Sequence, residues 1–153
     1  MESKNKTIAI IGARDCDSII SQIAEQIGSL LAESGYTVIC GGLGGVMEAV
    51  CKGAKAHHGT TIGILPGDDP HEANPYVDIA IATGVGVSRN LIIIRSATAV
   101  IAISGGYGTL SELAFALQLG KPVIGLGTWD ISDDVIVADS PRDAMKKLNK
   151  LLT

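Results

Sequence analysis

The sequence contains very few aromatic residues, and this shortage limits how its core is built. Phenylalanine, tryptophan and tyrosine make up 3% of the 153 residues, although 46% of the residues are hydrophobic. The core must therefore consist mainly of isoleucine, valine, leucine and alanine. This mixture is typical of parallel strands that are covered by helices on both faces.

An excess of positive charge is also missing. The formal net charge at pH 7 is −4, whereas proteins that bind a nucleic-acid backbone generally carry a basic surface. No hydrophobic run approaches the length of a membrane span, and the apolar stretch near the N-terminus is too short for a signal peptide. We therefore expect no nucleic-acid partner, no membrane partner and a cytoplasmic protein.

Cysteine is scarce, and its spacing does not indicate a metal site. The sequence has three cysteines, Cys16, Cys40 and Cys51, which is an odd number without the spacing of metal ligands. This pattern favours a reducing compartment. We expect no bound metal and no required cofactor.

The order of hydrophobic segments predicts an α/β fold. Strand-like runs, each short and rich in β-branched residues, are expected at 7–11, 36–40, 60–65, 78–83, 99–103 and 122–126. Helices with one apolar face are expected between or after them at 17–33, 46–57, 88–97, 109–119 and 141–151. Such units require right-handed crossovers. The sequence therefore predicts one Rossmann-like domain over residues 1–153, a three-layer sandwich with a mostly parallel central sheet.

Two common nucleotide-binding signatures are absent. No glycine loop is followed by Gly-Lys-Ser or Gly-Lys-Thr, which excludes a P-loop nucleotidase. The second expected strand ends in Cys40 and Gly41, without the acidic residue that holds the ribose of a dinucleotide. NAD-dependent hydride transfer is therefore disfavoured.

Glycine-rich turns follow four of the expected strands. They contain Gly12 after the first strand, Gly42, Gly44 and Gly45 after the second, Gly84 after the fourth, and Gly105, Gly106 and Gly108 after the fifth. Ligands of open parallel sheets bind at the carboxyl ends of the strands, and helix N-termini there bind anions. Thr109 adds a hydroxyl group at the start of one helix. These turns predict a phosphate site, although residues 41–45 are also compatible with a tight packing turn.

Few charged residues lie near these turns, which draws attention to two of them. Arg89 starts the helix after the fourth strand, and Glu112 lies one turn into the helix after the fifth. We expect these strand ends to be neighbours, so that both side chains reach the same ligand. The alternative is an ion pair that only fixes two helix starts.

The turns also carry a resemblance to a known family. The segment GGLGGVMEA at 41–49, which includes Met47, resembles the GGGxxGxM segment of the LOG family, once called lysine decarboxylase-like. The segment SGGYGTLSE at 104–112 resembles its PGGxGTxxE motif, and Arg89 stands where that family has its motif arginine. The resemblance covers residue 8 to about residue 126.

The resemblance implies a nucleoside 5′-monophosphate phosphoribohydrolase, which releases a free base and ribose 5-phosphate. It implies catalytic roles for Arg89 and Glu112 and phosphate contacts for the glycine turns and Thr109. Glu112 is then expected to stabilise an oxocarbenium-like transition state or to accept a proton from water. Arg89 is expected to bind the phosphate with its forked donors.

Two departures from the LOG pattern point to a sister branch. Ser104 replaces the motif proline, and residues 83–90 read TGVGVSRN, where LOG enzymes have MxxRK. The combination resembles the branch that includes the molybdenum cofactor carrier protein. The alternative expectation is therefore a non-catalytic carrier of the molybdenum cofactor, a phosphorylated pterin, or a nucleotide-binding sensor protein. Members of the superfamily imply a homo-oligomer, either a dimer or a tetramer.

Overall fold

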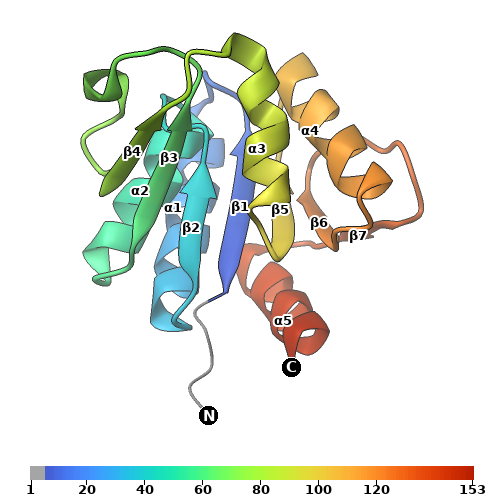
Figure 1. Ribbon diagram of the computed structural model, residues 1–153. Helices are drawn as coiled ribbons and strands as arrows, with labels where there is room; N and C mark the ends of the chain where they lie inside the picture. Colours follow the sequence, from blue (N-terminus) through green and yellow to red (C-terminus); the bar gives the residue numbers. More distant parts are fainter. Residues whose placement is uncertain (1–5) are drawn as a thin grey trace.

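The computed structural model describes residues 6–153. Seven strands form its central sheet: β1 (Thr7–Gly12), β2 (Thr37–Cys40), β3 (Thr61–Leu65), β4 (Ile79–Ala82), β5 (Ala99–Ile103), β6 (Val123–Leu126) and β7 (Val135–Val137) (Figure 1). Five α-helices accompany them: α1 (Ser18–Glu33), α2 (Val46–Ala56), α3 (Arg89–Arg95), α4 (Tyr107–Gln118) and α5 (Pro141–Leu152). Two short 3₁₀ helices, Pro70–Glu72 and Gly86–Ser88, lie in the loops on either side of β4.

The sheet confirms the expected α/β class and is parallel throughout. The strand order is β4-β3-β2-β1-β5-β6-β7, and every neighbouring pair is parallel. Six strands lie where the sequence predicts them. The seventh, β7, has only three residues, which is too short for a hydrophobic pattern to indicate.

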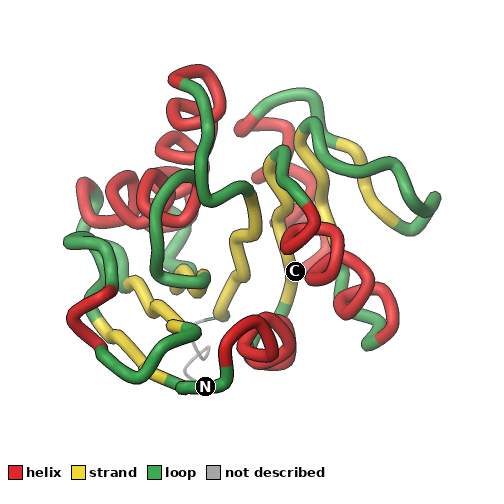
Figure 2. The backbone as a smooth tube through the Cα atoms, turned by 90° about the horizontal axis from the view of Figure 1, so that it is seen from above, coloured by secondary structure: helices red, strands yellow, loops and turns green. Residues whose placement is uncertain are grey.

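The helices cover both faces of the sheet (Figures 1 and 2). On one face, α1, α2 and α5 pack on the strands in a buried cluster that includes Ile10, Ile27 and Leu148. On the other face, α3 and α4 pack in a second cluster that includes Ile11 and Leu113. Burial of these aliphatic side chains, each stabilising the fold by about 1.5–3 kcal/mol, replaces the missing aromatic core.

The strand order corrects one expectation. The fourth and fifth strands are not neighbours, because β3, β2 and β1 lie between β4 and β5. The chain leaves β4 at the edge of the sheet and returns through α3 to pair β5 with β1. Helix α3 packs against α4 on its way. Arg89 therefore approaches Glu112 through helix packing and not through adjacent strand ends.

The helix starts differ in how their backbone N–H groups are satisfied. The side chain of Asp17 caps α1 by accepting from the Ile20 N–H at 2.8 Å, and Ser140 caps α5 in the same way. Neither α2 nor α4, which follow the glycine turns, has a side-chain cap. Uncapped N–H groups at a helix start can bind an external anion. Among residues 6–153, no helix is long and apolar enough to cross a lipid bilayer.

Candidate functional site

A cavity of about 510 Å³ opens where the strand order reverses, at the carboxyl ends of β1 and β5. From there α1 leaves on one face of the sheet and α4 on the other. Ligands of open α/β sheets bind at such reversal points. The cavity is lined by Gly12, Ala13, Arg14, Asp15, Leu43, Met47, Pro66, Val87, Arg89, Asn90, Gly106, Gly108, Thr109 and Glu112.

The start of α4 presents backbone N–H groups beside this cavity. Within residues 6–153, no acceptor is found for the N–H groups of Tyr107, Gly108 and Thr109. Gly105 has a φ of +116°, and a Cβ there would lie 2.4 Å from the Thr109 Cβ. Glycine at 105 thus allows the turn to close tightly on α4, which brings Gly106 and Gly108 to the cavity wall.

Arg89 contributes a positive charge that the protein holds in place. Its Nε donates to the Ile64 carbonyl oxygen at 2.9 Å, and its Nη1 donates to the Asn90 side-chain oxygen. A Cβ at Gly41 would lie 2.6 Å from the Arg89 Nη2, so glycine at 41 leaves space for the guanidinium. Burial lowers the pKa of Arg89, and the charge of Glu112 acts in the opposite direction. With two N–H groups bonded to protein, the others can serve a ligand.

Glu112 is a buried carboxyl group in the wall of the same cavity. It is 7% exposed, and burial raises its pKa to about 8, although the charge of Arg89 opposes this shift. The ion pairs formed within residues 6–153 do not include one between Arg89 and Glu112. The pair is therefore not the helix-fixing ion pair considered as an alternative. Strongly shifted groups that line a cavity are candidates for function.

Asn90 is a buried polar residue that the sequence reasoning did not select. It is 2% exposed, accepts from Arg89, and donates to the Ser111 hydroxyl at 3.3 Å. Ser111 in turn donates to the Gly108 carbonyl at 2.6 Å. This chain of hydrogen bonds connects α3 to the first turn of α4, so the arginine and the N–H groups hold fixed relative positions. The signal was available, because Asn90 directly follows Arg89 in the TGVGVSRN segment.

The structure brings seven of the expected site residues together. Those that line the cavity are Gly12, Met47, Arg89, Gly106, Gly108, Thr109 and Glu112. The others lie outside its lining: Gly42, Gly44, Gly45, Gly84 and Gly105. Their ligand contacts stay a prediction.

For two glycines outside the lining the structure shows a packing reason. A Cβ at Gly45 would lie 2.3 Å from the carbonyl oxygens of Ala13 and Arg14, and Gly45 has a φ of +63°. A Cβ at Gly42 would lie 2.8 Å from a Leu65 methyl carbon, and its φ is +77°. The second glycine turn thus allows α2 to approach β1 and β3 closely.

The lining contains further residues without a local sequence signal. Arg14 and Asp15 lie in the loop after β1, and both are exposed. The charge of Arg14 contributes to lowering the pKa of Arg89, which indicates that two arginines share this region. Within the described part of the chain, no group of three or more His, Cys, Asp or Glu side chains is arranged to hold a metal ion.

Comparison with known proteins places the chain in a family. Residues 5–151 match the SLOG cluster4 family. The chain belongs to this family. The resemblance to the LOG superfamily and its carrier branch is thereby confirmed.

Solved structures similar to this SLOG protein cover nearly its whole length. The molybdenum cofactor binding protein of Rippkaea orientalis is 36% identical, with a TM-score of 0.94 over 99% of this chain and 100% of that chain. The molybdenum cofactor carrier protein of Chlamydomonas reinhardtii is 33% identical, with a TM-score of 0.88 over 97% and 99%.

An enzyme of the LOG type is a more partial relative of this SLOG protein. The cytokinin riboside 5′-monophosphate phosphoribohydrolase of Mycobacterium marinum is 35% identical over 118 residues. The match spans 71% of this chain and 63% of that enzyme.

Proposed function

We propose that this protein binds a phosphorylated pterin of the molybdenum cofactor type and holds it without cleaving it. The observation that carries the proposal is the cavity at the β1–β5 reversal, where Arg89 and the unpaired N–H groups of α4 meet. The full-length similarity to the Rippkaea orientalis and Chlamydomonas reinhardtii proteins supports the choice of ligand.

The residues of the cavity fit both parts of such a ligand. The phosphate has the start of α4, Arg89 and Arg14 as donors. The ring system has an apolar wall made by Leu43, Met47, Pro66 and Val87. A volume of about 510 Å³ lies within the usual range of about 300–1,000 Å³ for small-molecule sites.

Glu112 favours binding over hydrolysis. With a pKa of about 8, its carboxyl group is mostly protonated at neutral pH. Ionising it at pH 7 costs about 1.4 kcal/mol, so only about a tenth of the molecules carry the carboxylate that could accept a proton from water or stabilise positive charge. A protonated carboxyl can instead donate a hydrogen bond to a ligand oxygen.

The experiment compares what co-purifies with three forms of the protein from cells that make molybdenum cofactor. We expect the wild type to carry molybdenum, measured by mass spectrometry, and a fluorescent oxidised pterin. Arg89→Ala should lose about ten- to a hundredfold in affinity, since it loses a charge-assisted hydrogen bond. Arg95→Ala, which removes an exposed arginine from the same helix, is the matched control and should behave as the wild type. If the purified wild type carries no pterin and no molybdenum, this result contradicts the proposal.

The second candidate is a nucleoside 5′-monophosphate phosphoribohydrolase. It is favoured by the placement of Arg89 and Glu112 in one cavity and by the similarity to the Mycobacterium marinum enzyme. Incubation with AMP, GMP and CMP, followed by chromatography for free base, tests it. Release of base by the wild type and its loss in Glu112→Gln would establish this candidate in place of the carrier.

A further inference from the structure

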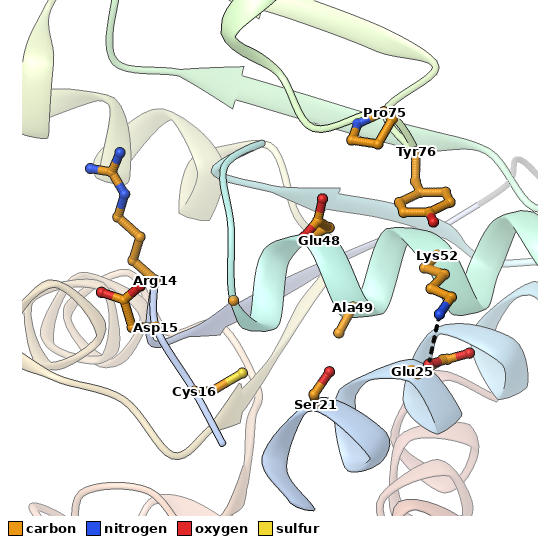
Figure 3. A pocket seen from close by; sticks show the side chains of 11 residues that line it. Arg14, Asp15, Cys16, Ser21, Glu25, Glu48, Ala49, Lys52, Pro75 and Tyr76 are labelled. Atoms are coloured by element: carbon orange, nitrogen blue, oxygen red, sulfur yellow. Dashed lines mark ion pairs between the residues drawn. The ribbon is translucent and has the colours of Figure 1, made fainter. Parts of the chain in front are cut away.

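A second cavity of about 450 Å³ lies on the other side of the loop that follows β1 (Figure 3). It is bordered by α1, by α2 as far as Lys52, and by the loop before β4 that carries Tyr76. Arg14 and Asp15 line both cavities, so the two adjoin at this loop. Nothing in the proposed function uses the second cavity.

Each of its two ends carries one cation and one carboxylate. Arg14 and Asp15 stand at one end, and the Lys52–Glu25 ion pair, at 3.8 Å, stands at the other (Figure 3). Glu48 lies between these ends on the first turn of α2. The charged side chains of the cavity are thus two cations and three carboxylates, which leaves one carboxylate in excess. This balance disfavours a phosphate and favours an uncharged ligand that carries N–H donors.

Glu48 has an unused carboxylate at the middle of this cavity. It is half-buried, and it takes part in none of the ion pairs or side-chain hydrogen bonds formed within residues 6–153. An ionised carboxylate only accepts hydrogen bonds, and its two oxygens can accept from two parallel donors. The complementary group is a flat ring edge on which a ring N–H stands beside an amino group.

The wall opposite α2 is rigid and aromatic. The Tyr76 backbone N–H donates to the Asn74 side-chain oxygen at 3.0 Å, and its carbonyl accepts from the Thr61 hydroxyl at 2.6 Å. The Tyr76 ring is half-buried beside the hydrophobic core. The ring of a tyrosine whose backbone is held in this way offers a surface against which a flat heterocycle can pack.

We propose that the second cavity binds the 2-amino-4-oxo edge of a pyrimidine-type ring, with Glu48 accepting from its N–H and amino groups. Guanine and pterin rings share this edge. The ring belongs either to a guanine nucleoside or to the same pterin, whose ring system then runs along the apolar wall of the first cavity and places its 2-amino-4-oxo edge in the second. The second case rests on the proposed function, and the first does not.

The experiment titrates guanosine, inosine and adenosine into the wild type and follows binding by calorimetry. Inosine lacks the amino group, and adenosine presents a different edge. We expect guanosine to bind about tenfold or more tightly than inosine, since one hydrogen bond to a charged group is lost. Glu48→Gln should remove this preference. Glu33→Gln, an exposed change on α1 outside both cavities, should keep it.

A second titration, with 6-hydroxymethylpterin phosphate, distinguishes the two sources. If Glu48→Gln and Arg89→Ala both weaken it, the two cavities hold one pterin ligand. If only Arg89→Ala weakens it while guanosine still depends on Glu48, the occupant is a guanine nucleoside. The proposal is overturned if Glu48→Gln changes the affinity of neither guanosine nor the pterin. It is also overturned if the wild type binds guanosine no more tightly than inosine and Glu48→Gln leaves the affinity for the pterin unchanged. If the wild type binds guanosine through Glu48 but does not bind the pterin, this result counts against the proposed function only.

Discussion

Replacing Glu112 with glutamine changes one buried ionisable group and keeps its shape. In the folded protein the pKa of Glu112 is about 8, against an ordinary value of 4.5, because its carboxyl is removed from water. The folded state therefore holds the proton more tightly than the unfolded chain. The wild type loses stability, relative to Glu112→Gln, as the pH rises from about 4.5 to about 8.

The size of the effect follows from the width of this pH range. Each pH unit within it contributes about 1.4 kcal/mol, so the full range gives at most about 5 kcal/mol. Partial rearrangement around the charge reduces this value, and we expect about 3–5 kcal/mol at pH 8.5. For a chain of this size the melting temperature should differ by on the order of 10 °C.

The assay is urea unfolding of the wild type and of Glu112→Gln at pH 5, 7 and 8.5. The variant should be nearly as stable as the wild type at pH 5 and more stable at pH 8.5. Glu33→Gln, which changes an exposed carboxylate, should follow the wild type within about 0.5 kcal/mol at every pH. A difference between the wild type and Glu112→Gln that does not vary with pH would refute the reasoning.

Five further substitutions, at four positions, test the glycine turns and the residues around them. Gly45→Ala should lower the free energy of unfolding, measured in urea, by about 3 kcal/mol or more, because its Cβ would lie 2.3 Å from two backbone carbonyl oxygens. A Cβ at Gly108 meets no atom within 4 Å, so Gly108→Ala should be tolerated. Ser104 has a φ of +52°, which proline cannot adopt, so Ser104→Pro should unfold at a markedly lower temperature while Ser104→Gly stays within about 1 kcal/mol. Gly41→Ala should fold but weaken ligand binding, measured by titration, since its Cβ would displace the end of the Arg89 side chain and the Met47 sulfur, and both residues line the cavity. Unchanged affinity would contradict this.

The fold was largely predictable because its signals are local. Runs such as 99–103 are buried along their whole length, and that is why a continuous aliphatic run indicated a strand. The order of the strands was less accessible, since no local pattern states which strands pair. The placement of β4 and β5 as neighbours failed for this reason.

The candidate site was predictable only in part. Arg89 and Glu112 were found because charge is rare near the glycine turns and because both stand in recognisable segments. Gly42 and Gly45 could not be told apart from the glycines that line the first cavity, since close packing and ligand contact both require glycine. Arg14 was missed because no local sequence pattern distinguishes an exposed charged residue beside a cavity from any other exposed charged residue in a loop.

The most direct test of the central claim is a fluorescence titration that compares a phosphorylated pterin with its dephosphorylated form at pH 7. The account predicts that the phosphorylated ligand binds at least about tenfold more tightly and is recovered unchanged, because Arg89 and the N–H groups of α4 bind its phosphate. Equal affinity for the two forms, or no binding of the phosphorylated form, would contradict it.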